Sequence, residues 1–282
     1  MNSCYDLHIH SKHSDGILTT YELVQRVKNA GLVGFALTDH DTVEGIQEAI
    51  EFGKKFGISV IPGIELTTYY NKSEVHLLGY FLDYTSDKLN AFLLKFRNNR
   101  FERMKKMVEK INALGLDVSF DEVIRLTNGS NVGRPHLARV LVAKGYVKDI
   151  SEAFEKYIGE HAPAYVPRMR ITVKEGVELI NSVGGVPIIA HPLLIKNFSL
   201  DFLSFSHSLG VKGFEVVYPY ESKNKNIDPQ LNEKIKEYCT THNLIMTGGT
   251  DFHSPTESVR IGSKCVNSLV VESLYRLSKN SI

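Results

Sequence analysis

The sequence is poor in cysteine, and its three cysteines form no recognisable motif. Cys4, Cys239 and Cys265 are far apart, and none belongs to a CxxC pair. A framework of disulfides is therefore not favoured, and neither is a zinc site built from thiolates. We expect free thiols, which are typical of a protein from the reducing cytoplasm.

Long apolar runs and an excess of charge of one sign are also missing. No apolar run approaches the ~20 residues that span a bilayer, and residues 1–6 lack the segments of a signal peptide. We therefore expect a cytoplasmic protein without a membrane partner. The 33 basic and 32 acidic residues give a formal net charge of +1, which argues against a stable complex with nucleic acid. A short nucleotide substrate remains compatible, because a local basic pocket does not show in a net count.

The order of the predicted elements indicates an α/β fold. Apolar runs such as 33–37 and 186–190 predict strands buried on both faces. Repeated strand–helix units imply a parallel sheet, either doubly wound or closed into a barrel. Only helical patterns occur from residue 86 to residue 165. We therefore predict one domain formed by 1–85 and 166–282, with an all-helical insertion at 86–165 that covers the substrate site.

Histidine and carboxylate side chains gather where the predicted strands end. His8 and His10 lie two residues apart on a strand, so both point to one face and can reach one ion. The other candidates follow later strands or lie on them: Asp15, His40, Glu65, His76, His191, Asp251 and His253. The carboxyl ends of parallel strands are where α/β and barrel enzymes place their active sites.

A structural role is the alternative for each of these residues taken singly. A lone histidine beside an apolar run, such as His76, is as compatible with a core residue as with a ligand, and we interpret His13, His161, His207 and His242 as ordinary residues. The whole set is different, because buried histidines and carboxylates are costly unless they are paired or bound to metal. The donors exceed one coordination shell, so we predict two or three divalent ions of manganese, iron or zinc.

Six motifs, in order along the chain, resemble those of the PHP (polymerase and histidinol phosphatase) superfamily. They are His8-x-His10, Asp15-Gly16, Thr38-Asp39-His40, Gly63-Ile64-Glu65, Ala190-His191-Pro192 and Asp251-x-His253. The resemblance spans almost the whole chain outside the insertion, and it implies a distorted seven-stranded β/α barrel with a trinuclear metal site. It assigns His8, His10, Glu65 and Asp251 to the first ion, Glu65, His76 and His191 to the second, and Asp15, His40 and His253 to the third.

The insertion resembles the nucleoside phosphatase branch of this superfamily. The segments GRPHLA, residues 133–138, and PAYVP, residues 163–167, carry the similarity. The branch removes phosphate from AMP or from 3′,5′-bisphosphorylated nucleosides, and some members degrade short RNA from the 5′ end. Arg134 and His136 would then bind substrate. Arg134 directly precedes a predicted helix, where its guanidinium and the free N–H groups together can hold an anion.

A structural role is the alternative for both residues. Arg134 would then lie at the surface, and His136 would lie in a core. Arg97, Arg100 and Arg103 recur at three-residue spacing, which is more typical of a solvated basic stripe than of a substrate pocket.

We predict an enzyme that hydrolyses phosphate monoesters of nucleotides with a metal-activated hydroxide. Asp251 is an expected catalytic residue, and His191 or His253 is expected to help protonate the leaving group. Asp39 and Asp41 are expected to orient metal-binding histidines. Three alternatives stay open: a 5′→3′ exonuclease on short RNA or DNA, a histidinol-phosphate phosphatase, and a non-catalytic module that binds metal. The sequence does not indicate the oligomeric state.

Overall fold

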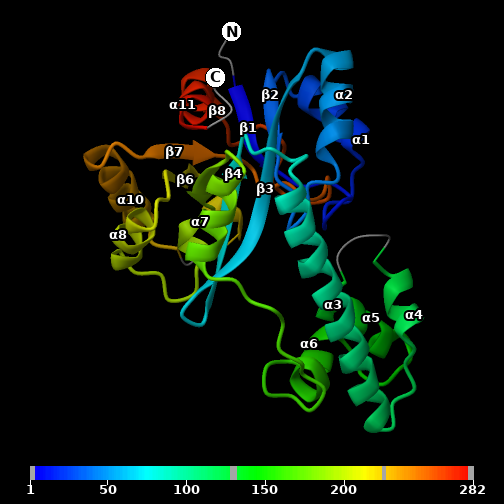
Figure 1. Cartoon of the computed structure of the whole chain (residues 1–282). Helices are drawn as coiled ribbons and strands as arrows, with labels where there is room; N and C mark the ends of the chain where they lie inside the picture. The colour runs from blue at the N-terminus through cyan, green and yellow to red at the C-terminus, as the bar shows by residue number, and fades with distance from the viewer. Residues whose placement is uncertain (1–3, 128–131, 224–226, 279–282) are drawn as a thin grey trace. The chain divides into compact units, whose positions relative to one another are not determined.

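A computed structural model describes residues 4–127, 132–223 and 227–278, and the chain divides into two compact units. The first unit comprises Met1–Asn90 and Arg170–Ile282, and the second unit is Ala91–Met169. Their helices and strands are drawn in Figure 1. Among the described residues, no helix is both long and apolar enough to cross a membrane.

The strands of the first unit form one eight-stranded mixed sheet in the order β7-β6-β5-β4-β3-β2-β1-β8. They are β1 (Cys4–Ile9), β2 (Gly34–Leu37), β3 (Ser59–Tyr70), β4 (Ser73–Tyr80), β5 (Val186–Ile189), β6 (Gly213–Val217), β7 (Ile245–Gly248) and β8 (Val266–Asn267). Beyond β7, Phe252 forms a parallel bridge with Ile9 of β1, and the N–H of His10 donates to the carbonyl of Phe252 at 3.0 Å. This contact joins β7 to β1, so the sheet is a distorted β/α barrel and the doubly wound alternative is excluded. The two-residue β8 is added to the outer edge of β1.

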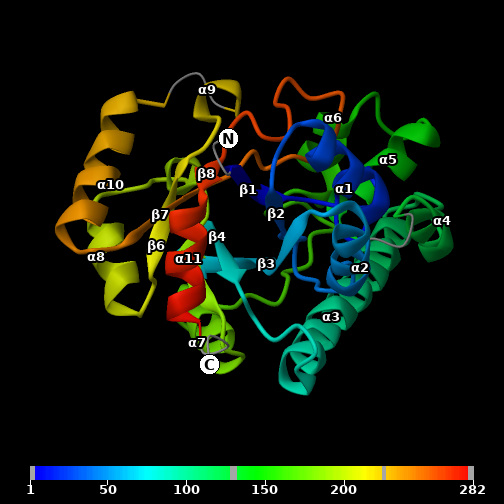
Figure 2. The same ribbon diagram turned by 90° about the horizontal axis from the view of Figure 1, so that it is seen from above.

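Helices cover the outside of this barrel. They are α1 (Thr20–Asn29), α2 (Ile46–Phe56), α7 (Val173–Ser182), α8 (Asp201–Ser208), α9 (Tyr220–Lys223), α10 (Pro229–Thr241) and α11 (Ser268–Leu277), with a 3₁₀ turn at Pro192–Leu194. Figure 2 shows α1 and α2 on one side of the strands, and α8 and α10 beside β6 and β7. The sequence explains α1 well: Thr19 and Glu22 form a capping box, and Leu23, Val24 and Val27 form the buried face.

The prediction of a parallel sheet is wrong at two strands: β8 pairs antiparallel with β1, and β4 is antiparallel to its neighbours. This strand pairs antiparallel with both β3 and β5, because only the short turn at Asn71 separates β3 from β4 and leaves no room for a crossover. The runs 58–61 and 64–68, which predict two strands, form the single strand β3. Glu65 and His76 consequently lie within strands and not at strand ends. They occupy the same face of the hairpin, since Glu65 pairs with Leu78 and Thr67 pairs with His76.

Every regular element described in the second unit is a helix or a helical turn. Its elements are α3 (Asp87–Ala113), which begins in the first unit, α4 (Phe120–Arg125), α5 (Arg134–Ala143), α6 (Ile150–Ala153) and a π-helical turn at Phe154–Ile158. Buried residues including Met107, Ile111, Val123, Leu137 and Leu141 form its own hydrophobic core. The long helix ends at Ala113, and Gly115 follows it with a φ of 82°, which favours glycine. That this unit covers the substrate site remains a prediction.

The prediction that all cysteines are free is wrong. Cys4 and Cys265 form a disulfide with a Cα–Cα distance of 5.8 Å across a sequence separation of 261 residues, whereas Cys239 is free and buried. The two residues meet because Cys4 begins β1 and Cys265 directly precedes β8, which pairs with β1. The sequence pattern predicts no strand after residue 253, so it does not bring Cys4 and Cys265 together. The expectation of a reducing compartment rested on free thiols, and the disulfide removes this support.

Candidate metal centre

All of the predicted metal ligands lie in the barrel unit. His8 comes from β1, His10 directly follows this strand, Glu65 comes from β3 and His76 from β4. The remaining ligands stand in segments that follow strands: Asp15 after β1, His40 after β2, His191 after β5, and Asp251 and His253 after β7. A parallel bridge between His40 and Glu65 extends the pairing of β2 with β3 and brings these two residues together.

The carboxylate of Glu65 is the centre of this arrangement and is completely buried. Its Oε2 lies 3.2 Å from Nε2 of His8, 3.2 Å from Nε2 of His10 and 3.2 Å from Nδ1 of His40. Its Oε1 lies 2.8 Å from Nδ1 of His76 and 3.0 Å from Nε2 of His191. One carboxylate therefore faces imidazoles from the segments of β1, β2, β4 and β5.

The polar atoms at this point are suited to a cation. Buried Nε2 of His8, both ring nitrogens of His10 and Oε2 of Glu65 have no hydrogen-bond partner. Burial opposes ionisation of Glu65, but the nearby imidazoles, above all His40 and His8, outweigh it and hold its pKa well below the usual range. Burial lowers the pKa of His40 to about 4, so this ring stays neutral and keeps lone pairs. Imidazole in its neutral form and an ionised carboxylate are both ligands for divalent metal ions.

Three groups of donors have the spacing that one ion requires. They are His8, His10, Glu65 and Asp251; His40, Glu65 and His76; and His10, Asp15, His40 and His253. In each group the donor atoms all lie within 4.8 Å of one another. The first group contains the same residues that the PHP resemblance implies. The second has His40 where the resemblance implies His191, and the third adds His10. The assignment of each ligand to an ion remains a prediction.

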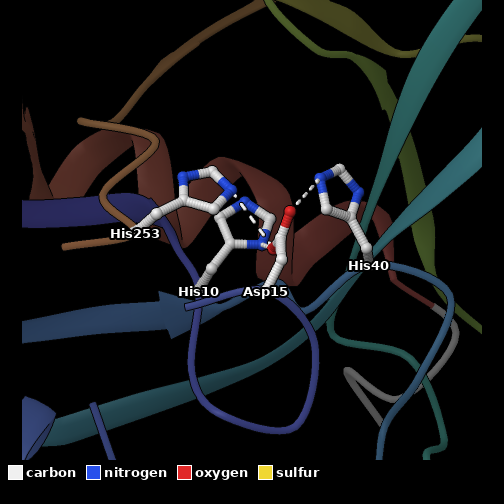
Figure 3. A group of neighbouring side chains, drawn as sticks. All are labelled: His10, Asp15, His40 and His253. Carbon is white, nitrogen blue, oxygen red and sulfur yellow. Dashed lines mark ion pairs between the residues drawn. The ribbon is translucent and has the colours of Figure 1, made fainter. Parts of the chain in front are cut away.

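Asp15 belongs to the third group, and its side chain is partly exposed. Its Oδ1 lies 3.2 Å from Nε2 of His253 and 3.7 Å from Nδ1 of His10, and its Oδ2 lies 3.8 Å from Nε2 of His40. Figure 3 shows the Asp15 carboxylate between the ring of His40 and the stacked rings of His10 and His253. Burial raises the pKa of Asp15, but the surrounding histidines outweigh it and hold the pKa below the usual range.

Two ligands have backbone conformations that non-glycine residues rarely adopt. His191 has φ 24° and ψ 59°, and Asp251 has φ 51°. Such residues persist only where the surrounding structure holds them, and they occur mostly at functional sites.

The two aspartates that are expected to orient histidines accept hydrogen bonds from other groups. Asp39 accepts hydrogen bonds from the backbone N–H and hydroxyl of Ser11 and from the hydroxyl of Ser14. Asp41 accepts from the backbone N–H and hydroxyl of Thr67. For Asp39 the expected role is therefore wrong, because it fixes the loop that carries Asp15 and touches no ring.

Sequence reasoning missed two buried carboxylates next to the ligands. Oε1 of Glu215 on β6 lies 3.0 Å from Nδ1 of His8, and Glu215 has no exposed surface. Asp6 on β1 accepts from the N–H of Thr250 at 2.9 Å and from the N–H of Gly262 at 3.0 Å. The signal was present in both cases: a charged residue inside an apolar run, as in Gly-Phe-Glu-Val-Val, needs a partner when buried.

Above the donors the barrel is open to solvent. A cavity of about 270 Å³ is lined by His40, Glu74, His76, His191, Asp251 and His253, with Leu194 and Ile195. The predicted catalytic residues His191, Asp251 and His253 thus share one cavity. Its volume is slightly below the roughly 300–1,000 Å³ that is typical of ligand pockets.

The predicted substrate contacts Arg134 and His136 lie in the second unit, at the start of α5. The guanidinium of Arg134 lies over the rings of Phe154 at 5.2 Å and Tyr165 at 5.6 Å. Nδ1 of His136 accepts from the N–H of Gly133 at 3.1 Å, so this ring caps the helix and is half-buried. Whether either residue contacts substrate remains a prediction.

Arg103 differs from the solvated stripe that its spacing predicts. It is half-buried, its Nε donates to the carbonyl of Val166, and its guanidinium lies 5.8 Å from the ring centre of Tyr165. Burial and the neighbouring Arg134 lower its pKa to about 10. Among the described residues, neither Arg103 nor Arg134 has a carboxylate partner. This pair is therefore suited to bind an anion.

Comparison with known proteins agrees with this geometry. The sequence profile of the PHP domain matches residues 6–166. A 3′,5′-nucleoside bisphosphate phosphatase of Chromobacterium violaceum is 34% identical over 90% of this chain and 89% of its own length. A 5′-3′ exoribonuclease of Haemophilus influenzae is 32% identical over 93% of this chain and 94% of its own length. Among solved structures, a candidate metal-dependent phosphoesterase from Bifidobacterium adolescentis superposes with a TM-score of 0.81 at 26% identity, covering 97% of this chain and 96% of that one.

Proposed function

The chain belongs to the PHP domain family of metal-dependent phosphoesterases, and from this membership we propose that it removes phosphate from nucleotides. The substrates are AMP-like monophosphates or 3′,5′-bisphosphorylated nucleosides, and the cofactors are two or three ions of manganese, iron or zinc. Similarity to a 3′,5′-nucleoside bisphosphate phosphatase along nearly the whole chain supports this substrate class.

The observation that carries the proposal is the shared carboxylate of Glu65. Its two oxygens face imidazoles in two different donor groups, with Oε2 at 3.2 Å from His10 and Oε1 at 2.8 Å from His76. A carboxylate that two donor groups share would help to hold two ions together, and two-metal sites favour displacement at phosphorus. When bound, divalent ions lower the pKa of water and neutralise charge on the phosphoryl oxygens.

The side chains of the cavity have the remaining roles. His8, His10, Glu65 and Asp251 would hold one ion, and His76 and His191 would complete a second group with Glu65. His191 and His253 line the cavity, and we propose that one of them supplies a proton to the leaving oxygen. Arg134 and Arg103 would bind a phosphate of the substrate, because a guanidinium pair without a carboxylate partner favours an anion.

A 5′→3′ exonuclease on short RNA is the second candidate. The similarity to exoribonucleases of Haemophilus influenzae favours it, at 32% identity over 93% of this chain. Both reactions would use the same donors and differ in the length of chain that the site accepts. Histidinol-phosphate phosphatase and a metal-binding module without activity remain as outcomes of the test.

The deciding experiment measures product release by the chelator-treated enzyme with and without added Mn²⁺. Phosphate is measured with AMP, a 3′,5′-bisphosphorylated adenosine and histidinol phosphate, and mononucleotide with 5′-phosphorylated RNAs of graded length. Mn²⁺-dependent turnover of the nucleotides but not of histidinol phosphate is expected. A rate that is highest on the RNAs would favour the exonuclease. Bound metal without turnover of any substrate would leave the metal-binding module.

A further inference from the structure

A buried carboxylate on β6 touches two predicted metal ligands, which the PHP resemblance assigns to different ions. Glu215 has no exposed surface. Its Oε1 lies 3.0 Å and its Oε2 3.2 Å from Nδ1 of His8. The same Oε2 accepts a hydrogen bond of 2.9 Å from the backbone N–H of His191. His8 belongs to β1 and His191 follows β5, so one side chain connects two segments of the barrel that are far apart in sequence.

The contact with His8 selects one form of the imidazole. A carboxylate only accepts hydrogen bonds, so the ring nitrogen that faces Glu215 carries the proton. In the neutral ring that a metal ion requires, the lone pair is then on Nε2, which lies 3.2 Å from Oε2 of Glu65 and 3.4 Å from Oδ1 of Asp251. This nitrogen has no hydrogen-bond partner. Glu215 therefore presents His8 in the tautomer that a metal ion at Nε2 requires.

The contact with His191 acts on the backbone. The dihedral angles of this residue, φ 24° and ψ 59°, are outside the regions that non-glycine residues favour. Glu215 holds the N–H of this residue, and the ring then reaches Glu65, with Nε2 at 3.0 Å from Oε1. An unusual backbone conformation needs such external contacts to persist.

Strand β6 has the local geometry for this task. Its pairing with β7 has a bulge, since Glu215 pairs with Thr247 while Val217, two residues later, pairs with Gly248, the next residue of β7. Bulges redirect side chains and are frequent next to functional sites. The carbonyl of Glu215 also accepts from the hydroxyl of Tyr220 at 3.3 Å, which fixes the backbone beneath the carboxylate.

We infer that Glu215 is a positioning residue for two metal-ligand groups at once, through the tautomer of His8 and the backbone of His191. The inference rests on the proposed function, because it requires that these histidines bind metal. Since one side chain orients both groups, its loss should weaken both together.

The test is titration of Mn²⁺ into the chelator-treated full-length protein. The variants are E215Q, H8A and E215Q/H8A. Glutamine has the shape of glutamate but no charge and only one acceptor oxygen, so its hydrogen bonds to His8 and His191 should be weaker. We expect E215Q to lower Mn²⁺ affinity roughly 10- to 100-fold, with an unchanged far-ultraviolet circular dichroism spectrum. Because Glu215 acts on the first group through His8, adding E215Q to H8A should cause no further loss at that group.

Several results would overturn the role of Glu215. One is an Mn²⁺ affinity of E215Q that equals that of the parent protein. Another is a loss of affinity in E215Q/H8A that equals the product of the fold-losses in the two single variants. If E215Q does not fold, ¹⁵N NMR of the parent protein provides the answer, with the His8 signals identified by their absence from H8A. A proton on Nδ1 is expected, and a proton on Nε2 alone would contradict the inference. A parent that binds no Mn²⁺, or H8A that binds as the parent does, would instead refute the metal centre itself.

Discussion

The hydroxyl of Tyr218 donates a hydrogen bond of 2.7 Å to Oδ2 of Asp251. This bond leaves Oδ1 of the same carboxylate directed at Nε2 of His10, 3.2 Å away, and at Nε2 of His8, 3.4 Å away. Tyr218 is itself buried, so it holds a carboxylate whose backbone conformation is unusual. The two oxygens of Asp251 therefore have separate tasks, one structural and one directed at the donor group.

Removing this hydroxyl should loosen the candidate ligand without removing it. For Tyr218→Phe we expect Mn²⁺ affinity and turnover to fall roughly 10-fold, the lower limit for a residue that orients a ligand. Tyr238→Phe is the control, because the Tyr238 hydroxyl lies 3.3 Å from Nδ1 of His207, which is not a predicted ligand. Mn²⁺ titration and steady-state rates of both variants measure the difference. Equal behaviour of the two variants would contradict this role of Tyr218.

The shared carboxylate of Glu65 should be the most sensitive position of the centre. Glu65→Gln replaces one of the two oxygens that face different donor groups, so both groups should bind metal poorly. We expect turnover to fall by more than about 100-fold, beyond the range of outer contacts. Metal content by emission spectroscopy and phosphate release measure this effect.

Glu74→Gln is the control for Glu65, because Oε1 of Glu74 lies 2.9 Å from Nε2 of His76 on the same hairpin but is largely exposed. Its loss should reduce turnover by roughly 10-fold at most. A Glu65→Gln enzyme with parental metal content and rate would refute the bridging role.

The sequence predicted the barrel and the candidate ligands better than it predicted the contacts that hold these ligands in place. Spacing of two residues placed His8 and His10 on one face, since alternation along a strand is a local property. The direction of β4 depends on how short its connection to β3 is, and the contact between Glu215 and His8 joins residues 207 positions apart. Such pairings depend on the closure of the sheet, which no local pattern contains. Gly249 illustrates this: a Cβ there would lie 2.4 Å from the N of His8, so its need for glycine appears only in the closed barrel.

The arginine pair of the second unit should act on substrate binding more than on the chemical step. Arg134 and Arg103 lie over the same ring, Tyr165, without a carboxylate partner. If they bind a substrate phosphate, Arg134→Ala should raise KM roughly 10-fold or more, the effect of losing a hydrogen bond between charged groups, and change kcat little. Arg139→Ala is the control, because Arg139 is exposed on the same helix. An unchanged KM in Arg134→Ala would exclude the contact.

The disulfide between Cys4 and Cys265 should stabilise the barrel, because it closes a loop of almost the whole chain. Removal of a native disulfide typically costs about 2–5 kcal/mol. We therefore expect a lower midpoint of thermal unfolding for the reduced protein and for Cys4→Ser. Cys4 and Asp6 lie on the same strand, and Asp6 holds the N–H of Thr250 beside Asp251, so metal affinity should also decrease.

Thiol titration in denaturant determines whether this bond is present. One thiol per chain, that of Cys239, is expected without reductant, and all three after reduction. A reductant should not change the unfolding midpoint of Cys4→Ser, which already lacks the bond, and this comparison separates the disulfide from other effects of the reagent. Three reactive thiols in the untreated protein, with the same midpoint in both redox conditions, would show that β1 and β8 are held by their backbone pairing alone.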